Sequence, residues 1–370
     1  MLATNLERFV NRVERAPLPE VSARAAALHR ASAVVDLHAD SLLFGRDLRR
    51  HSNFGHVDLP RLREGGVLLQ VFGVATSAPF GMNIERNEAP GLLDTIALLF
   101  CNRLTPGCLG GPPARLAAQA QRLAQLTERD RGLVWVRTAA DLEQLRARHT
   151  SDRAVLGAIL GIEGAHALGA GPDALDRAFA LGVRMVGLTH FFDNDYAGSA
   201  HGAAKGGLSE LGRRTIARME ELGIAIDVAH LAPAAIDDVL AIARKPVVVS
   251  HGGVKGTCPN ARTLSDAHLR GIAATGGVIG IGYWKEAVCG TAPADVARAI
   301  RYAVDLVGDE HVALGSDYDG GTVVSFDAGQ LPVLTQAMLD AGLAETSVRR
   351  VLGENALRVL AATLPKGESR

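Results

Sequence analysis

Val34-Val35-Asp36-Leu37-His38-Ala39-Asp40-Ser41 is an apolar run that ends in a histidine and an aspartate two positions apart. Alternate side chains of a β-strand point to the same face, so His38 and Asp40 would lie side by side, with Cα atoms roughly 6.5 Å apart. Two such groups can bind one cation. Because an apolar strand followed by a residue of this kind recurs along the chain, the stretch indicates how the whole fold is organised.

Seven further apolar segments have the composition of buried β-strands, and most alternate with alanine-rich helices. These predicted strands are residues 67–75, 155–162, 184–189, 224–229, 247–250, 278–283 and 312–316. Helices are predicted at residues 173–181, 209–222, 233–243, 265–274, 292–306 and 330–341. Nearly continuous apolar strands are typical of parallel sheets that are covered on both faces. Eight β/α units predict a closed (β/α)8 barrel, a TIM-type fold.

The competing fold is an open, doubly wound sheet. It would require a glycine-rich phosphate-binding turn after its first strand, where this chain has Asp40-Ser41-Leu42. The remaining segments are predicted to attach to the barrel as a helical N-terminal extension (residues 1–30) and a helical insertion (residues 86–150), which has a glycine- and proline-rich break at residues 106–113. The chain, residues 1–370, is therefore expected to form a single domain.

The composition excludes several classes of partner. The formal net charge is -1, from 39 basic and 40 acidic residues, which argues against binding to nucleic acid or to an anionic membrane. No apolar run reaches the length of about 18 residues that spans a bilayer. Without a hydrophobic secretion signal or a C-terminal lipid-anchor signal, the expected location is cytoplasmic. The four cysteines (Cys101, Cys108, Cys258 and Cys289) have no Cys-x-x-Cys spacing and read individually as small buried hydrophobic residues.

Residues just beyond the C-terminal ends of barrel strands converge on one mouth. At these ends the sequence places His38 with Asp40, Glu163, His190, His230, His251, and Asp317 with Asp319. His230 and His251 each follow an aliphatic strand, where packing alone would favour Val or Ile. Glu163 would be costly to bury unless it were paired or bound to metal. The histidines without such a strand read instead as structural: His29, His51, His56, His149, His268 and His311, with His166 offset from its strand by a loop.

Three histidines and two carboxylates exceed the ligands of one catalytic zinc, which commonly binds three protein groups and a water. Two ions fit the count better, with His38 and Asp40 on one, His230 and His251 on the other, and Glu163 bridging them. Imidazole with carboxylate favours zinc, although manganese or cobalt could substitute.

Several further motifs, spread over most of residues 34–360, form a characteristic series in their order and spacing. They are Gly161-Ile162-Glu163-Gly164, Leu188-Thr189-His190, Gly207-Leu208-Ser209, Ile226-Asp227-Val228-Ala229-His230, Ser250-His251, the segment 262–266, Gly315-Ser316-Asp317-Tyr318-Asp319-Gly320 and Gly353-Glu354-Asn355-Ala356. Together they resemble the membrane dipeptidase (renal dipeptidase) family of zinc metallopeptidases, which is amidohydrolase-like.

The resemblance implies a distorted barrel with two zinc ions that hydrolyses dipeptides and often tolerates a D-residue on the C-terminal side. It implies the same five metal ligands, with Glu163 bridging. By the same resemblance, His190 would stabilise the tetrahedral intermediate, Asp317 would transfer the proton, and Arg262 would bind the free carboxylate of the substrate. Cys258 and Cys289 fall about where secreted members carry a disulfide, which implies that these two lie close together.

The chain departs from the family pattern at two positions near these residues. Ala229 stands where the family usually has serine, and Thr263 stands where asparagine usually follows the arginine. The first change leaves the metal ligand in place but removes a hydroxyl that could support it. The second concerns the preference for particular substrates.

The predicted activity is hydrolysis of a peptide bond by a hydroxide that bridges the two ions, since metal binding lowers the pKa of water to about 7. Tyr283 and Trp284, which follow the seventh strand, are predicted to form an aromatic wall for the dipeptide. An alternative is another binuclear-metal amidohydrolase that acts on cyclic amides, lactones or N-acyl amino acids. Such enzymes usually open with His-x-His rather than His-x-Asp. A non-catalytic barrel that binds a metal or an amino acid is a third class, and the oligomeric state stays open, a homodimer included.

Overall fold

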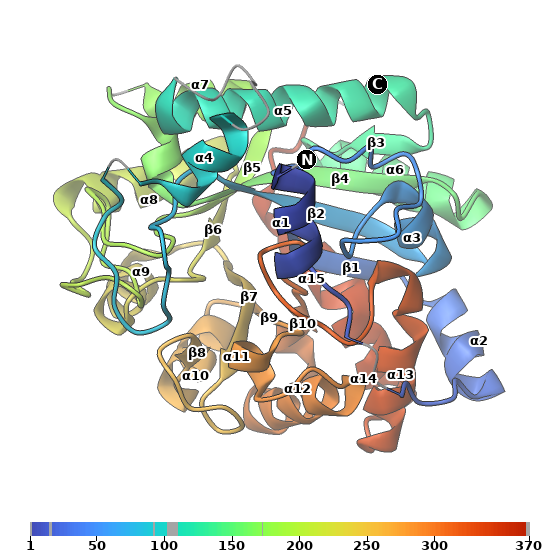
Figure 1. Cartoon of the computed structure of the whole chain (residues 1–370). Helices are drawn as coiled ribbons and strands as arrows, with labels where there is room; N and C mark the ends of the chain where they lie inside the picture. The colour runs from blue at the N-terminus through green and yellow to red at the C-terminus, as the bar shows by residue number, and fades with distance from the viewer. Residues whose placement is uncertain (1, 15–16, 92, 102–109, 172, 368–370) are drawn as a thin grey trace.

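The computed structural model describes residues 2–14, 17–91, 93–101, 110–171 and 173–367. Eight parallel strands form a ring in the order β2-β1-β10-β9-β7-β6-β5-β4, and pairing of β4 with β2 closes it (Figure 1). These strands are β1 (Val34–Ala39), β2 (Val67–Ala75), β4 (Leu156–Glu163), β5 (Val183–Gly187), β6 (Ala225–Asp227), β7 (Val247–Val254), β9 (Val278–Ile281) and β10 (Val312–Leu314). They correspond one to one with the eight predicted strands, which confirms the closed (β/α)8 barrel.

Every ring strand is buried along its whole length. Apolar side chains fill the barrel interior on one face and contact the helices on the other, as expected for parallel strands. A buried polar pair joins β1 to the end of β10. Asp36 accepts hydrogen bonds from the backbone N–H (2.8 Å) and the hydroxyl (2.6 Å) of Ser316. This contact brings the segment that begins at Asp317 beside His38, whose carbonyl accepts the Asp317 N–H at 3.2 Å.

The helices surround the ring, and capping residues mark the ends of several of them. Ser209 caps α8 through its side chain, and Gly223 ends that helix in the left-handed conformation at φ 75°. The helices are α1 (Leu2–Val10), α2 (Ala23–Ala31), α3 (Leu59–Glu64), α4 (Thr95–Cys101), α5 (Gly111–Arg129), α6 (Ala139–Ser151), α7 (Ala174–Ala180), α8 (Glu210–Leu222), α9 (Pro233–Ile242), α10 (Asp266–Ala274), α11 (Lys285–Val288), α12 (Pro293–Val307), α13 (Pro332–Asp340), α14 (Glu345–Arg349) and α15 (Asn355–Thr363). Short 3-10 or π turns are η1 (Ala165–Leu168), η2 (Asp309–His311), η3 (Ala328–Gln330) and η4 (Arg350–Glu354). Within the described ranges, none of these helices combines the length and apolar character needed to cross a membrane.

Segments outside the eight units add to the rim of the barrel. Within residues 86–150, α4, α5 and α6 accompany β3 (Leu133–Trp135), which pairs with β4 outside the ring. The first half of the predicted break at residues 106–113 lies outside the described residues, and α5 begins within its second half, at Gly111. A short strand, β8 (Thr263–Leu264), pairs with the end of β7. The N-terminal segment contributes α1 and α2, and Figure 1 shows α1 crossing in front of β1 and β2.

Cys258 and Cys289 form a disulfide, with Cα atoms 5.3 Å apart. The proximity implied by the family resemblance is therefore confirmed, and the reading of these two cysteines as small buried hydrophobic residues is wrong. The bond joins the segment after β7 to the end of α11. A side-chain contact reinforces the link, because Asn260 Nδ2 donates to the Glu286 carbonyl at 2.8 Å. The segment that carries Arg262 is thus fixed against α11.

Candidate metal centre

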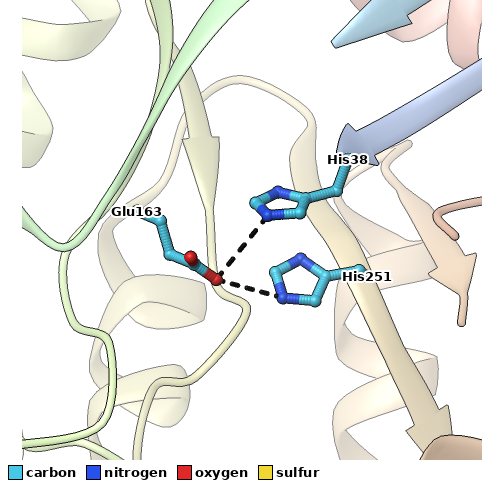
Figure 2. A group of neighbouring side chains, drawn as sticks. All are labelled: His38, Glu163 and His251. Carbon is cyan, nitrogen blue, oxygen red and sulfur yellow. Dashed lines mark ion pairs between the residues drawn. The ribbon is translucent and has the colours of Figure 1, made fainter. Parts of the chain in front are cut away.

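The five predicted metal ligands meet at the C-terminal mouth of the barrel. The oxygen Oε1 of Glu163 lies 2.9 Å from His230 Nε2, 3.2 Å from His251 Nε2 and 3.7 Å from His38 Nε2. Asp40 Oδ2 lies 3.2 Å from His38 Nε2. Figure 2 shows the imidazoles of His38 and His251 directed at the same carboxylate oxygen. Residues more than 200 positions apart in the chain therefore share one site.

The backbone around this site is shaped to fit these side chains. His230 and Asp317 have left-handed φ values of 62° and 60°, which side chains other than glycine rarely adopt and which concentrate at functional sites. Gly73 on β2 provides room for the His38 ring, since a Cβ atom there would lie 2.5 Å from His38 Cε1. A side chain at Gly73 would therefore displace the first predicted ligand.

A buried chain of hydrogen bonds fixes the tautomer of His251. Ser250 Oγ lies 2.5 Å from Asp227 Oδ2 and 2.8 Å from His251 Nδ1. The Ser250 hydroxyl donates its hydrogen to Asp227, so Ser250 Oγ accepts the Nδ1–H of His251. The Nε2 atom of His251 is left with a free lone pair facing Glu163. A histidine ligand oriented by a hydrogen bond at its other nitrogen is characteristic of metal sites.

The charges of the centre match a cation site. Burial lowers the pKa of His230 and of His251 well below the ordinary value, so both imidazoles are neutral. Burial opposes ionisation of Glu163, but His190 and His38 outweigh it and hold the pKa of this carboxyl well below its usual range. Burial also opposes protonation of His38, yet Asp40 and Glu163 raise its pKa to about 10. The Glu163 carboxylate is therefore stabilised by positive charge beside it.

The donor set fits a transition metal of the zinc type. Three groups have ligand atoms within 4.8 Å of one another: His38 with Glu163 and His251, Glu163 with His190 and His230, and His38 with Asp40 and Asp317. In the described part of the chain, Asp40 Oδ1 and His230 Nδ1 are buried and have no hydrogen-bond partner. Imidazole combined with carboxylate suits zinc. The sequence predicted that His251 shares a metal ion with His230. The distances in the structure also group His251 with His38.

A cavity of about 880 Å³ opens onto this centre. Among its lining residues are Asp40, Glu163, His190, His230, Arg262, Trp284 and Asp317. His190 Nε2 lies 3.3 Å from Glu163 Oε2. Burial raises the pKa of Asp317 well above its ordinary value, although His38 opposes the shift. This cavity therefore brings together the predicted metal ligands, the two predicted catalytic residues and Arg262, which line it or lie directly beside it.

Arg262 is a buried cation at the edge of this cavity. Its Nη2 donates to the His251 carbonyl at 3.1 Å, and its guanidinium lies 5.4 Å from the centroid of the Trp284 ring. Its backbone N–H donates to Asn260 Oδ1 at 2.8 Å. With one side held by protein, the remaining N–H groups of Arg262 are placed to bind an anion.

The structure does not place Tyr283 among the residues that line the cavity, so its contact with the substrate stays a prediction. Tyr283 is fully buried and packs against Tyr318 and Phe326, with ring centroids 5.4 and 5.2 Å away. Strand β9 ends at Ile281, two residues before the predicted end, so the chain turns there and Trp284 faces the cavity instead. Asp319 likewise has a structural role, since it accepts hydrogen bonds from Ser41 Oγ (2.6 Å) and the His56 N–H (2.7 Å).

The sequence model of the membrane dipeptidase family (peptidase family M19) matches residues 22–367. This chain belongs to the membrane dipeptidase family. Among curated relatives, dipeptidase aclJ of Aspergillus oryzae is 36% identical over 215 residues, which are 55% of this chain and 51% of that protein. Dipeptidase verJ of Clonostachys rogersoniana is 32% identical over 212 residues, 55% of each protein. The chain thus spans about half the length of the curated relatives it matches.

A solved structure of the same architecture gives broader coverage. The metallo peptidase from Rhodobacter sphaeroides, described as liganded with a phosphinate mimic of the dipeptide L-Ala-D-Ala, is 27% identical and superimposes with a TM-score of 0.73. The similarity covers 90% of this chain and 99% of that one. The barrel of this membrane dipeptidase family member is therefore like that of a known metallopeptidase.

His201 is a cavity residue that strand-end reasoning missed in this family member. Its Nδ1 lies 2.6 Å from the Ile84 carbonyl, so Nδ1 carries the proton, and its ring stacks on Phe191 at 4.8 Å. Burial lowers the pKa of His201 to about 3, which keeps the ring neutral. No strand precedes His201 in the loop between β5 and α8. The only available signal was another histidine within a loop rich in glycine and alanine.

Replacing Ser250 by alanine is expected to weaken metal binding about 10- to 100-fold, because it removes the group that orients His251. Competition with a chromogenic chelator measures the dissociation constant. Ser32→Ala is the matched control, since the Ser32 hydroxyl is also buried and donates a hydrogen bond, to the Leu28 carbonyl at 2.7 Å, but Ser32 does not line the cavity. Equal losses of metal affinity in both variants would mean that Ser250 only stabilises the fold.

Proposed function

We propose that this protein is a metal-dependent dipeptidase that hydrolyses the peptide bond of dipeptides at a two-zinc centre bridged by Glu163. The observation that carries the proposal is one buried carboxylate surrounded by His38, His190, His230 and His251, in a cavity that also holds Arg262. Membership of the membrane dipeptidase family supports the reaction class. A bound divalent ion would polarise the peptide carbonyl and lower the pKa of water.

The side chains of this chain would supply positions and protons. His38, Asp40, Glu163, His230 and His251 would hold the ions. Asp317 would take a proton from the attacking water and deliver it to the leaving amine, as general acid-base catalysis requires. Its raised pKa suits a group that must hold that proton for part of the cycle. His190 would donate an N–H to the oxygen that becomes negative in the transition state.

Arg262 would measure the length of the substrate. A guanidinium binds a carboxylate through two parallel hydrogen bonds, so a free C-terminus one residue beyond the cleaved bond would be recognised. Burial lowers the pKa of Arg262, while Asp317 and Glu163 oppose that shift, and the group stays charged. We propose that dipeptides with a C-terminal D-residue are included, since the Rhodobacter sphaeroides structure was liganded with a mimic of L-Ala-D-Ala.

Arg262→Ala is expected to lower kcat/KM for Ala-Ala about 10- to 100-fold, mainly through KM, because a hydrogen bond to a charged group contributes about 1.5–3 kcal/mol. Metal content should stay unchanged in elemental analysis. The C-terminal amide of Ala-Ala serves as the matched substrate and should be slow with both proteins. An equal loss on the dipeptide and on its amide would remove Arg262 from carboxylate recognition.

The proposed function is tested with zinc-loaded protein and a library of dipeptides that have L- or D-residues at the C-terminus. Release of free amino acids from dipeptides, but not from tripeptides, is the expected result. Parallel assays use N-acyl amino acids, cyclic amides and lactones. Turnover confined to one of those groups would replace the dipeptidase proposal with the alternative amidohydrolase, and the absence of turnover on all of them would favour a binding protein.

A further inference from the structure

We propose that the N-terminal arm, residues 6–14, closes an apolar subsite that binds the side chain of the substrate's N-terminal residue. The enzyme would then prefer dipeptides that begin with a large apolar residue. This inference rests on the proposed dipeptidase function and extends it to the class of substrate.

The arm is docked on the segment that follows β10. Glu7 forms an ion pair with Arg46, which in turn pairs with Asp319, and the three side chains are at most 5% exposed. Asn11 Oδ1 accepts the Gly321 N–H at 2.8 Å. Buried ion pairs hold elements in one arrangement because separating them leaves an uncompensated charge. The arm is therefore a built part of the cavity mouth.

Backbone hydrogen bonds continue this docking towards the end of the arm. The Glu14 N–H donates to the Val324 carbonyl at 2.7 Å, and the Val324 N–H donates to the Arg12 carbonyl at 3.2 Å. Asp317 lies on the same segment as Val324, so the arm is attached directly to the segment with a predicted catalytic group. The family match begins at residue 22, so the arm is an element of this chain that the family pattern does not describe.

The helical part of the arm presents an apolar wall to the cavity, and the charged Arg12 and Glu14 line it further along the arm. Leu6 and Val10, one helical turn apart, both line it, whereas Phe9 lies on the exposed side of α1 and is 69% exposed. Val10 packs on an apolar cluster near the ends of β1 and β2. The cavity-lining members of that cluster are Leu43, Phe44, Ala75, Ala78, Ile96 and Leu99. This half of the cavity suits an aliphatic or aromatic side chain.

The barrel order places this wall opposite the carboxylate site. Strand β7, which leads to Arg262, is the fourth strand from β2 in either direction around the ring. The metal ligands lie between these two sides. A dipeptide whose carboxylate contacts Arg262 and whose peptide bond lies at the metal centre would direct its N-terminal residue towards β2 and the arm. The apolar wall would then contact that residue's side chain.

The experiment compares kcat/KM of the zinc-loaded protein for Gly-Ala, Leu-Ala and Phe-Ala, and for Ala-Gly, Ala-Leu and Ala-Phe. We expect the wild-type protein to prefer Leu-Ala over Gly-Ala at least about tenfold, since each methylene in an apolar pocket can contribute about 10-fold. Val10→Trp should fill the subsite and lower kcat/KM for Leu-Ala about tenfold while Gly-Ala changes little. The Leu6→Ala/Val10→Ala double variant should reduce the preference for Leu-Ala.

Phe9→Ala, on the exposed side of the same helix, is the matched control and should leave every ratio unchanged. Dissociation constants of phosphinate mimics of Gly-Ala and Leu-Ala, measured by calorimetry, give a readout that does not depend on turnover. Uniform changes across both series, or a changed preference at the C-terminal residue, would overturn the subsite. If the wild-type protein hydrolyses none of the dipeptides, the proposed function fails; if it hydrolyses them with ratios that the arm variants leave unaltered, only the subsite fails.

Discussion

Glu163→Gln is expected to remove stoichiometric metal and to lower kcat/KM for dipeptides about 10³-fold or more, because a metal contributes several kcal/mol to stabilising the transition state. The substitution keeps the size of the side chain but removes the charge that faces His230 and His251 at 2.9 and 3.2 Å. Elemental analysis after reconstitution with zinc, together with dipeptide kinetics, measures both effects. Treating the wild-type protein with a chelator should reproduce the loss, and zinc should reverse it.

Glu220→Gln provides the matched control for this prediction. Glu220 is another buried glutamate, on α8, and it accepts the backbone N–H groups of Arg244 and Lys245 at 2.6 and 2.9 Å. It does not line the cavity. The control should keep metal and turnover, with its effect confined to thermal stability. Retention of both zinc and activity in Glu163→Gln would exclude Glu163 as the bridging ligand.

Asp317→Asn is expected to keep the metal and to lower kcat about 10²- to 10⁴-fold, the range that a general acid-base contributes. Asparagine preserves the shape of the side chain but cannot carry the proton from water to the leaving amine. Metal content separates two roles, because Asp317 also lies within ligand distance of His38 and Asp40. Loss of metal from this variant would make Asp317 a ligand and contradict the proton role.

Asp319→Asn is the informative comparison for Asp317. Both aspartates follow β10 and have left-handed φ values near 60°. Asp319 is paired with Arg46 and is completely buried, so weakening that pair should destabilise the fold by about 3 kcal/mol while kcat of the folded protein stays unchanged. Asp317→Asn should therefore lower kcat, whereas Asp319→Asn should lower the stability to thermal unfolding and leave kcat unchanged. Similar kcat losses in both would place Asp319 in the chemistry as well.

The strands and most of the site could be predicted because a parallel barrel converts chain order into position. An apolar strand that ends in a ligand-type residue can only deliver that residue to the mouth, so His38, Glu163, His230 and His251 were found from the sequence. What each residue does there stays a prediction, as do the cytoplasmic location and the homodimer.

The features that sequence reasoning missed depend on how loops pack. His201 follows no strand, and the side on which Tyr283 or Trp284 lies depends on where β9 ends. The sequence predicted a helical N-terminal extension at residues 1–30 but not the surface that it covers. That surface is selected by pairing of Glu7 with Arg46, a residue 39 positions further along the chain. The spacing of Cys258 and Cys289 in the sequence does not by itself predict a disulfide, and only the family resemblance implied that the two lie close together.

The disulfide between Cys258 and Cys289 has a practical consequence for biochemistry on this protein. Thiol reductants would open the link beside Arg262 and would also compete for zinc, because thiolates are strong ligands of that metal. A phosphine reduces a disulfide without adding a thiolate that binds zinc. Activity measured after treatment with each reagent would therefore separate the effect of opening the disulfide beside Arg262 from the effect of removing the metal. In a compartment rich in glutathione the bridge would be open, and the pocket would then keep its shape through the hydrogen bonds of Asn260, the bond from Arg262 to the His251 carbonyl and the pairing of β8 with β7.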